Sequence, residues 1–118
     1  MKVLLVDDSS TMRKIQTTQL KQLGIHNILE AENGEDVLTV LKDNMPVDAI
    51  LLDRNMPVMD GLTFLQKVRT DTQYKNVKIF MCTSESEKSK VIEAPKAGAN
   101  NYIIKIFTSD VLKQKLGI

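Results

Sequence analysis

Five side chains suited to phosphoryl transfer lie at or just after the ends of short apolar segments in this 118-residue chain. The segments have the length of buried parallel strands, and ligand sites in open α/β sheets form beside the C-terminal ends of such strands. Carboxylates can hold a divalent cation and accept a phosphoryl group, while a hydroxyl and an ammonium can bind the transferred group. The pattern therefore predicts phosphoryl transfer onto an aspartate. The residues are Asp7, Asp8, Asp53, Thr83 and Lys105.

Each of these residue types meets a need of that reaction. A carboxylate attacks phosphorus poorly because anionic oxygens surround the phosphorus, so a metal ion and a fixed cation must neutralise the charge. Mg²⁺ prefers octahedral oxygen ligands, which suits Asp8 and Asp53 as direct ligands, Asp7 through water, and a backbone carbonyl from the turn after Asp53. Lys105 supplies the fixed cation, and the Thr83 hydroxyl can donate a hydrogen bond to a phosphoryl oxygen. We expect the metal site and the phosphorylation site to be one site.

The segments that must position these residues alternate between strand-like and helix-like patterns five times along the chain. This alternation predicts an α/β fold with a doubly wound, five-stranded parallel sheet. Right-handed crossovers can bring the strands that bear the five residues side by side. The expected strands are Lys2–Val6, Asn27–Ala31, 48–53, 77–82 and Asn101–Lys105, and the expected helices after the first are 35–43, 60–70, 87–97 and 110–116.

The first expected helix begins at Ser9 or Ser10 as its N-cap, and Gly24 ends it. Thr83 and Ser84 are expected to open the loop after the fourth strand. The apolar stripe that should face the sheet consists of Met12, Ile15, Leu20 and Leu23.

The composition favours one compact domain and excludes several functions. The length and the 42% apolar content suit a single domain with a real core. Sixteen basic against fifteen acidic residues, without a basic block, argue against nucleic-acid binding. The apolar run near the N-terminus is too short for a signal peptide or a membrane span, so we expect a cytoplasmic protein without membrane insertion. Cys82, within an apolar run, is expected to be a small buried hydrophobe.

The segments LLVDDSSTMRKI, LLDRNMPVMDG, CTSE and AGANNYIIK, followed by a helix after Phe107, occur in this order. Together they resemble the receiver domains of two-component response regulators, and most of all the single-domain chemotaxis members. The resemblance covers essentially the whole chain, residues 1–118, as one receiver domain. It implies a flavodoxin-like (βα)5 fold with strand order 2-1-3-4-5.

The same resemblance implies a phosphoacceptor that is not an enzyme in the usual sense. Such a protein takes phosphate from a chemotaxis-type histidine kinase or, with Mg²⁺, phosphorylates itself from small acyl phosphates, and it dephosphorylates itself. By resemblance the output is a partner protein such as a flagellar motor switch component, which binds the face formed by the helix at 87–97, the strand Asn101–Lys105 and the helix at 110–116. The implied roles are Asp53 as phosphoacceptor, Asp7 and Asp8 as the acidic metal pair, Asn55 as carbonyl ligand, Thr83 as switch hydroxyl, Lys105 as phosphate-contacting lysine and Tyr102 as the aromatic that changes rotamer.

Two positions on that output face depart from the family pattern. Receivers usually have Lys-Pro-Phe, with a cis bond before the proline, where this chain has Lys105, Ile106 and Phe107. A cis bond before a residue other than proline costs about 2.5 to 4 kcal/mol, so we expect a trans bond and a shifted loop. Pro95 predicts a kink or break in the helix at 87–97. These departures leave open an alternative function, a degenerate receiver that works as a binding module without efficient phosphorylation.

Overall fold

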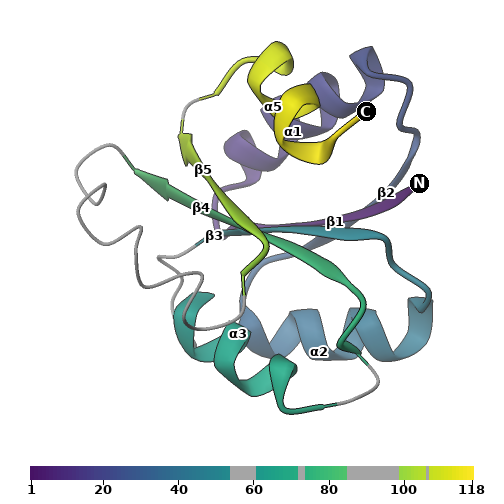
Figure 1. The fold of residues 1–118 in the computed structure, drawn as a ribbon, viewed down its shortest axis with the longest axis vertical. Helices are drawn as coiled ribbons and strands as arrows, with labels where there is room; N and C mark the ends of the chain where they lie inside the picture. Colours follow the sequence, from purple (N-terminus) through teal and green to yellow (C-terminus); the bar gives the residue numbers. More distant parts are fainter. Residues whose placement is uncertain (54–60, 72–73, 85–98, 106) are drawn as a thin grey trace.

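The computed structural model contains a five-stranded parallel sheet between two layers of helices (Figure 1). The strand order is β2-β1-β3-β4-β5, which confirms the predicted doubly wound topology. Helices α1 and α5 cover one face of the sheet, and α2 and α3 cover the other. The structure describes residues 1–53, 61–71, 74–84, 99–105 and 107–118. The elements are β1 (Lys2–Val6), α1 (Ser10–Gln22), β2 (Asn27–Ala31), α2 (Gly34–Asn44), β3 (Ala49–Asp53), α3 (Gly61–Arg69), β4 (Lys78–Ser84), β5 (Asn101–Lys105) and α5 (Ser109–Leu116).

The two central strands are apolar along nearly their whole length because helices cover both of their faces. In β3 all five residues are buried, and in β1 only Lys2 is partly exposed. Continuous apolar runs of this kind are typical of buried parallel strands. The sheet therefore holds the C-terminal ends of β1 and β3, where Asp7 and Asp53 lie, against each other on a rigid support.

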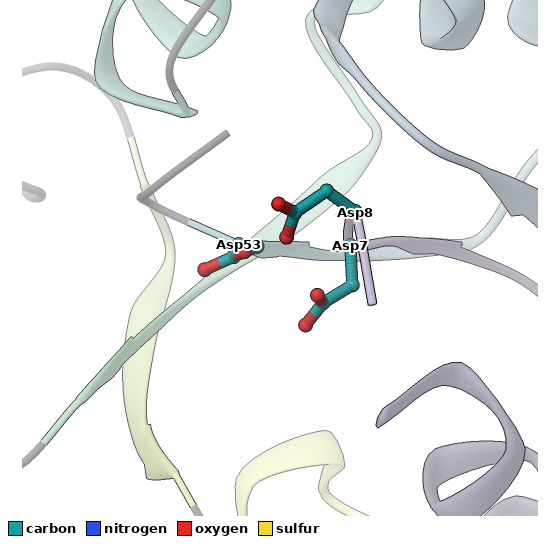
Figure 2. Close-up of side chains that lie close together, drawn as sticks. All are labelled: Asp7, Asp8 and Asp53. Atoms are coloured by element: carbon teal, nitrogen blue, oxygen red, sulfur yellow. The ribbon is translucent and has the colours of Figure 1, made fainter. Parts of the chain in front are cut away.

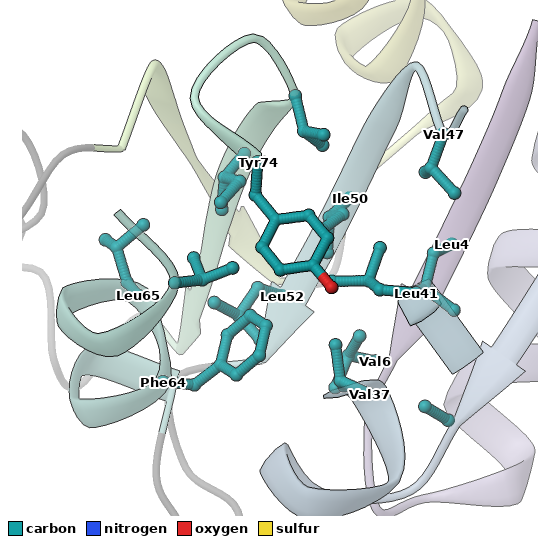
Figure 3. Close-up of a cluster of buried hydrophobic side chains, with 14 of the residues drawn as sticks. Leu4, Val6, Val37, Leu41, Val47, Ile50, Leu52, Phe64, Leu65 and Tyr74 are labelled. Atoms are coloured by element: carbon teal, nitrogen blue, oxygen red, sulfur yellow. The ribbon is translucent and has the colours of Figure 1, made fainter. Parts of the chain in front are cut away.

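Alternating side chains of the strands form two separate hydrophobic clusters, one on each face of the sheet. Figure 3 shows the cluster beneath α2 and α3, in which the Tyr74 ring packs among aliphatic side chains and Phe64. This cluster also includes Leu4, Val6, Val37, Leu41, Ile50, Leu52, Leu65, Val68, Ile79 and Met81. The cluster beneath α1 and α5 includes Val3, Leu5, Leu20, Leu51, Phe80, Cys82, Ile103, Phe107, Leu112 and Leu116.

Helix α1 has the predicted ends but a different buried stripe. Ser9 is its N-cap, with the Ser9 hydroxyl accepting from the Met12 amide at 3.2 Å, and Gly24 follows the helix with φ of +86°. The prediction that Ile15 faces the sheet is wrong: Ile15 is 37% exposed, whereas Gln16 is 2% exposed. Residues 12, 16, 20 and 23 share one side of a helix with 3.6 residues per turn, and Ile15 lies off that stripe.

Strand β4 extends further than the sequence predicts. Thr83 pairs with Ile104 and Ser84 with Lys105, so the prediction that Thr83 and Ser84 open a loop is wrong. The ladder with β5 continues through both residues, and the β-branched Thr83 suits an extended strand. The other described strands and helices lie within about two residues of the predicted bounds. Asp60, the expected first residue of the helix at 60–70, the helix at 87–97 with Pro95, and Ile106 lie outside the described residues.

Two side-chain hydrogen bonds join α1 to the start of α5 and to Phe107, just before that helix. The Gln19 side-chain amide donates to the Phe107 carbonyl, and the Ser109 hydroxyl donates to Gln22 Oε1 at 2.7 Å. Phe107 follows Lys105 by two residues, so these contacts hold Phe107 and the start of α5 against α1 shortly after the end of β5. In the parts of the chain that the structure describes, no helix is both long and apolar enough to cross a membrane.

Candidate functional site

Three of the predicted residues meet at the C-terminal edge of the sheet, each from a different strand end. Lys105 Nζ lies 2.7 Å from Asp53 Oδ1 and 3.1 Å from Asp7 Oδ2. Asp7 is 1% exposed and Asp53 is 4% exposed. The Lys105 ammonium therefore bridges two buried carboxylates, Asp7 and Asp53, which are 46 residues apart in the sequence.

Asp8 completes a cluster of three carboxylates. One ligand atom from each of Asp7, Asp8 and Asp53 lies within 4.8 Å of the others, and Figure 2 shows their side chains grouped at the strand ends. Asp8 is exposed, so the cluster opens to solvent on its side. The donors are hard, anionic oxygens, and such a set fits Mg²⁺, which prefers oxygen ligands and keeps several waters. Asn55, the expected carbonyl ligand, lies outside the described residues.

Backbone hydrogen bonds fix Asp7 from two sides. The Asp7 amide donates to the Ala31 carbonyl at 3.2 Å, which continues the pairing of β1 with β2. The Ser9 amide donates to Asp7 Oδ1 at 2.9 Å, so that the first residue before α1 also orients the carboxylate. Asp7 thus keeps a defined direction before any ligand binds.

The charge state of Lys105 results from two opposed effects. Burial disfavours the ammonium and lowers its pKa, but hydrogen bonds and charge from Asp53 and then Asp7 outweigh that effect and raise the pKa above its ordinary value. The side chain is only 16% exposed. Lys105 is therefore a fixed cation at neutral pH, directed at the carboxylates.

Thr83 lies on β4, the strand next to β3, and its side chain is buried. Cys82 pairs with Asp53 across β3 and β4, and Thr83 is the next residue of β4. Thr83 is 1% exposed, and its Oγ1 has no hydrogen-bond partner within the described segments. An unpaired buried hydroxyl costs about 1–3 kcal/mol, so this group is available to a partner that arrives later.

Tyr102 lies on β5, three residues before Lys105, and is half-buried. The ammonium of Lys115, from α5, lies 4.6 Å from the centre of the Tyr102 ring, which is within the range of a cation–π contact. The Lys115 ammonium is also 3.4 Å from Asn101 Oδ1. The Tyr102 ring therefore faces α5 in this structure.

Arg13 belongs to the site, and the sequence reasoning missed it. Its Nη1 donates to the backbone carbonyl of Asp7, and its Nε lies 3.0 Å from Glu30 Oε1. The available signal was a basic residue in the first turns of the helix that follows the acidic pair. That signal is weak because basic residues are common on exposed helix faces.

Cys82 should make the free energy of unfolding fall with rising pH in the alkaline range. Complete burial raises the pKa of the thiol to about 12 from 9.0, with smaller effects from Lys105, Asp53 and Asp7. Above about pH 9 the unfolded chain loses this proton while the folded chain keeps it, so the free energy of unfolding falls as pH rises towards 12. One group contributes a slope of about 1.4 kcal/mol per pH unit at most.

Denaturant unfolding of the wild type and of Cys82→Ala between pH 8 and pH 10.5 measures this contribution. The Cys82→Ala variant should be less stable at pH 8 because a cavity forms, and its stability should fall less steeply above pH 9. Parallel pH profiles for the two proteins would contradict the prediction. They would mean that the thiol ionises as easily in the folded chain as in the unfolded one.

A comparison with known families shows which family the chain belongs to. The sequence profile of the response regulator receiver domain matches residues 3–117. The chain belongs to the response regulator receiver family. As a receiver domain it is a two-component signalling protein, of a class that is generally not enzymatic.

Among the proteins similar to this chain are chemotaxis proteins. Chemotaxis protein CheY1 of Helicobacter pylori is 48% identical to this receiver over 118 residues, which cover 100% of this chain and 95% of that protein. The CheY homologue of Campylobacter jejuni is 49% identical over 116 residues, covering 98% of this chain and 89% of that protein.

Solved structures confirm the flavodoxin-like receiver fold. CheY4 of Vibrio cholerae superposes with a TM-score of 0.87 at 34% identity, covering 98% of this receiver and 95% of that chain. A putative response regulator from Chloroflexus aurantiacus gives a TM-score of 0.88 at 30% identity, covering 99% and 98% of the two chains.

Proposed function

We propose that this chain is a single receiver domain over residues 1–118 that accepts a phosphoryl group on Asp53 from a histidine kinase of the chemotaxis type. The observation that supports this most strongly is the Lys105 ammonium, 2.7 Å from Asp53 Oδ1 and 3.1 Å from Asp7 Oδ2. A buried carboxylate beside a fixed cation and two further carboxylates combines an acceptor, a phosphate-binding group and a cation site. The names of its chemotaxis relatives support the same signalling role.

Asp7, Asp8 and Asp53 would hold Mg²⁺, with the Asn55 carbonyl added by family resemblance. When bound, the ion neutralises the negative charge that otherwise keeps a phosphoryl group away from these carboxylates. The exposure of Asp8 leaves the cluster open to solvent, which agrees with the waters that Mg²⁺ retains.

The residues of the chain then divide the work of the transfer. An oxygen of Asp53 forms the new bond to phosphorus as the bond between phosphorus and the donor atom breaks, and the donor keeps that electron pair. Lys105 binds a phosphoryl oxygen, and the Thr83 hydroxyl donates a hydrogen bond to another. Thr83 Oγ1, which has no hydrogen-bond partner among the described residues, supports this part of the proposal because the phosphoryl group would give it one.

Signalling follows from the charge that the reaction adds. A phosphoryl group brings nearly two negative charges and new acceptor oxygens to Asp53, and Thr83 turns towards them. Tyr102 then leaves its contact with Lys115 and turns into the space that Thr83 vacates. The face that includes β5 and α5 changes, and in the cytoplasm a partner such as a flagellar motor switch component reads the change. Two arrangements within a few kcal/mol of each other suffice for such a switch.

The alternative, a degenerate receiver, assumes that Ile106, in place of the proline usual in receivers, misdirects the Lys105 side chain. Ile106 lies outside the described residues. The contacts of Lys105 with Asp53 and Asp7 favour a correctly directed lysine, and the hydrogen bond from Gln19 to the Phe107 carbonyl holds the chain just beyond it. We therefore favour an active phosphoacceptor.

Incubation of the whole chain with acetyl phosphate, followed by intact mass spectrometry, tests the proposed function. The proposal predicts a gain of one phosphoryl group with Mg²⁺, and no gain when a chelator removes the metal. Absence of a mass gain at any Mg²⁺ concentration, with the chain folded by circular dichroism, would favour the degenerate receiver instead.

A further inference from the structure

Arg13 ties three parts of the fold together beside the carboxylate cluster. The side chain extends from α1 and is only 11% exposed. Its Nη1 donates to the backbone carbonyl of Asp7 at the end of β1. Its Nε lies 3.0 Å from Glu30 Oε1 on β2, and its Nη2 lies 3.8 Å from Glu32 Oε1 just beyond β2.

The contact with the Asp7 carbonyl is the important one. The two glutamates are 54% and 70% exposed, so the surrounding water weakens these ion pairs, and they mainly keep the planar guanidinium in one orientation. The carbonyl oxygen of Asp7 belongs to the planar peptide that joins Asp7 to Asp8. A hydrogen bond to that oxygen therefore fixes the direction in which the Asp8 residue leaves the strand.

Asp8 depends on this support more than the other two carboxylates do. Lys105 binds both Asp7 and Asp53, and the Ser9 amide also binds Asp7. For the Asp8 carboxylate, no hydrogen bond is found within residues 1–53, 61–71, 74–84, 99–105 and 107–118. Its exposed side chain takes its direction from its own backbone, and Arg13 holds that backbone.

We propose that Arg13 is a positioning residue for the divalent cation site. It holds the peptide between Asp7 and Asp8 so that the Asp8 carboxylate faces Asp7 and Asp53, and it raises Mg²⁺ affinity without contacting the ion. This inference rests on the proposed function. Groups that orient the ligands of a metal typically change its affinity by about 10- to 100-fold when they are replaced.

The sign of the effect separates positioning from charge. Coulomb's law alone predicts that removing a cation near a carboxylate cluster strengthens the binding of a divalent cation. The positioning role predicts weaker binding when Arg13 becomes neutral, and also when lysine keeps the charge but loses the planar fork. Lys14, the next residue of α1, is exposed and provides a control with the same change in charge.

Calorimetric titration of the unphosphorylated chain with MgCl₂ alone tests the proposal. Arg13→Met and Arg13→Lys should each weaken Mg²⁺ binding by about tenfold. Lys14→Met should leave it unchanged or slightly tighter. Thermal unfolding without Mg²⁺ checks that each variant is folded. If Arg13→Met does not fold, the affinity of Arg13→Lys alone tests the proposal.

A second readout distinguishes positioning from a general loss of structure. With acetyl phosphate, Arg13→Lys should need about tenfold more Mg²⁺ for half-maximal phosphorylation but reach nearly the wild-type rate at saturation. Wild-type affinity in Arg13→Lys, tighter binding in Arg13→Met, or an unchanged half-saturation with a lower maximal rate would each overturn the inference while leaving the proposed function intact. A wild-type chain that binds no Mg²⁺ would overturn both.

Discussion

Replacement of Asp53 by asparagine is expected to abolish phosphorylation of the chain by acetyl phosphate. Asparagine has nearly the shape of aspartate but lacks the anionic oxygen that attacks phosphorus. Asp53 is buried and accepts the shorter of the two Lys105 contacts, at 2.7 Å against 3.1 Å for Asp7, so its carboxylate lies nearest the fixed cation. Intact mass spectrometry with saturating Mg²⁺ should show full loss of the phosphoryl mass gain.

Asp43→Asn is the matched control, because Asp43 is exposed on α2 and the same atoms are exchanged there. That variant should gain the phosphoryl group at the wild-type rate. A comparable mass gain in Asp53→Asn would show that another residue accepts phosphate, and the proposed site would then be wrong.

Replacement of Lys105 by methionine is expected to slow phosphorylation by about 10²-fold or more, because the transferred group loses its fixed positive charge. The same change removes the cation that Asp7 and Asp53 share. These two carboxylates are buried, at 1% and 4% exposed. Removal of one partner from a buried ion pair costs about 3 kcal/mol or more, so the chain should also unfold at lower denaturant concentration. Mass spectrometry over time and denaturant unfolding measure the two effects.

Lys113→Met makes the same change in charge on the exposed side of α5 and should have little effect on either measurement. Mg²⁺ should restore part of the stability that Lys105→Met loses, since it supplies positive charge to the same carboxylates. A Lys105→Met chain that reacts at the wild-type rate would show that the ammonium contacts in the structure have no catalytic importance.

The sequence predicts the fold and the meeting of the acidic residues because both depend on strong, local patterns. Buried parallel strands such as Ala49–Asp53 read as continuous apolar runs, and the polar residue that ends each run must lie at the C-terminal edge of the sheet. Right-handed crossovers allow these strands to lie side by side, and the resemblance to receiver domains implies the order that the structure shows. These rules suffice to place Asp7, Asp53 and Lys105 together before any coordinates are known.

The errors arise where tertiary packing decides between local alternatives. Ile15 is more apolar than Gln16, so composition favours Ile15 as the buried residue, but the position of α1 on the sheet buries Gln16. Thr83 and Ser84 resemble a turn, yet pairing with β5 keeps them in the strand. In both cases long-range contacts outweigh the local preference.

The contacts of Arg13 could not be predicted because a guanidinium on a helix has no sequence signal for the carbonyl it will bind. Its partner, the Asp7 backbone oxygen, is identified only when β1, β2 and α1 are placed in space. The same holds for the hydrogen bond from Gln19 to the Phe107 carbonyl, which joins residues 88 positions apart. Long polar side chains that bind the backbone of distant elements are the part of the site that only the structure reveals.

The most direct test of the central claim is to locate the phosphoryl group in the phosphorylated chain. After reaction with acetyl phosphate and Mg²⁺, rapid proteolysis at low temperature and tandem mass spectrometry should place a single phosphoryl group on Asp53. A phosphoryl group on any other residue, or equal modification of Asp53 when the metal has been removed, would contradict the account of one shared metal and phosphorylation site.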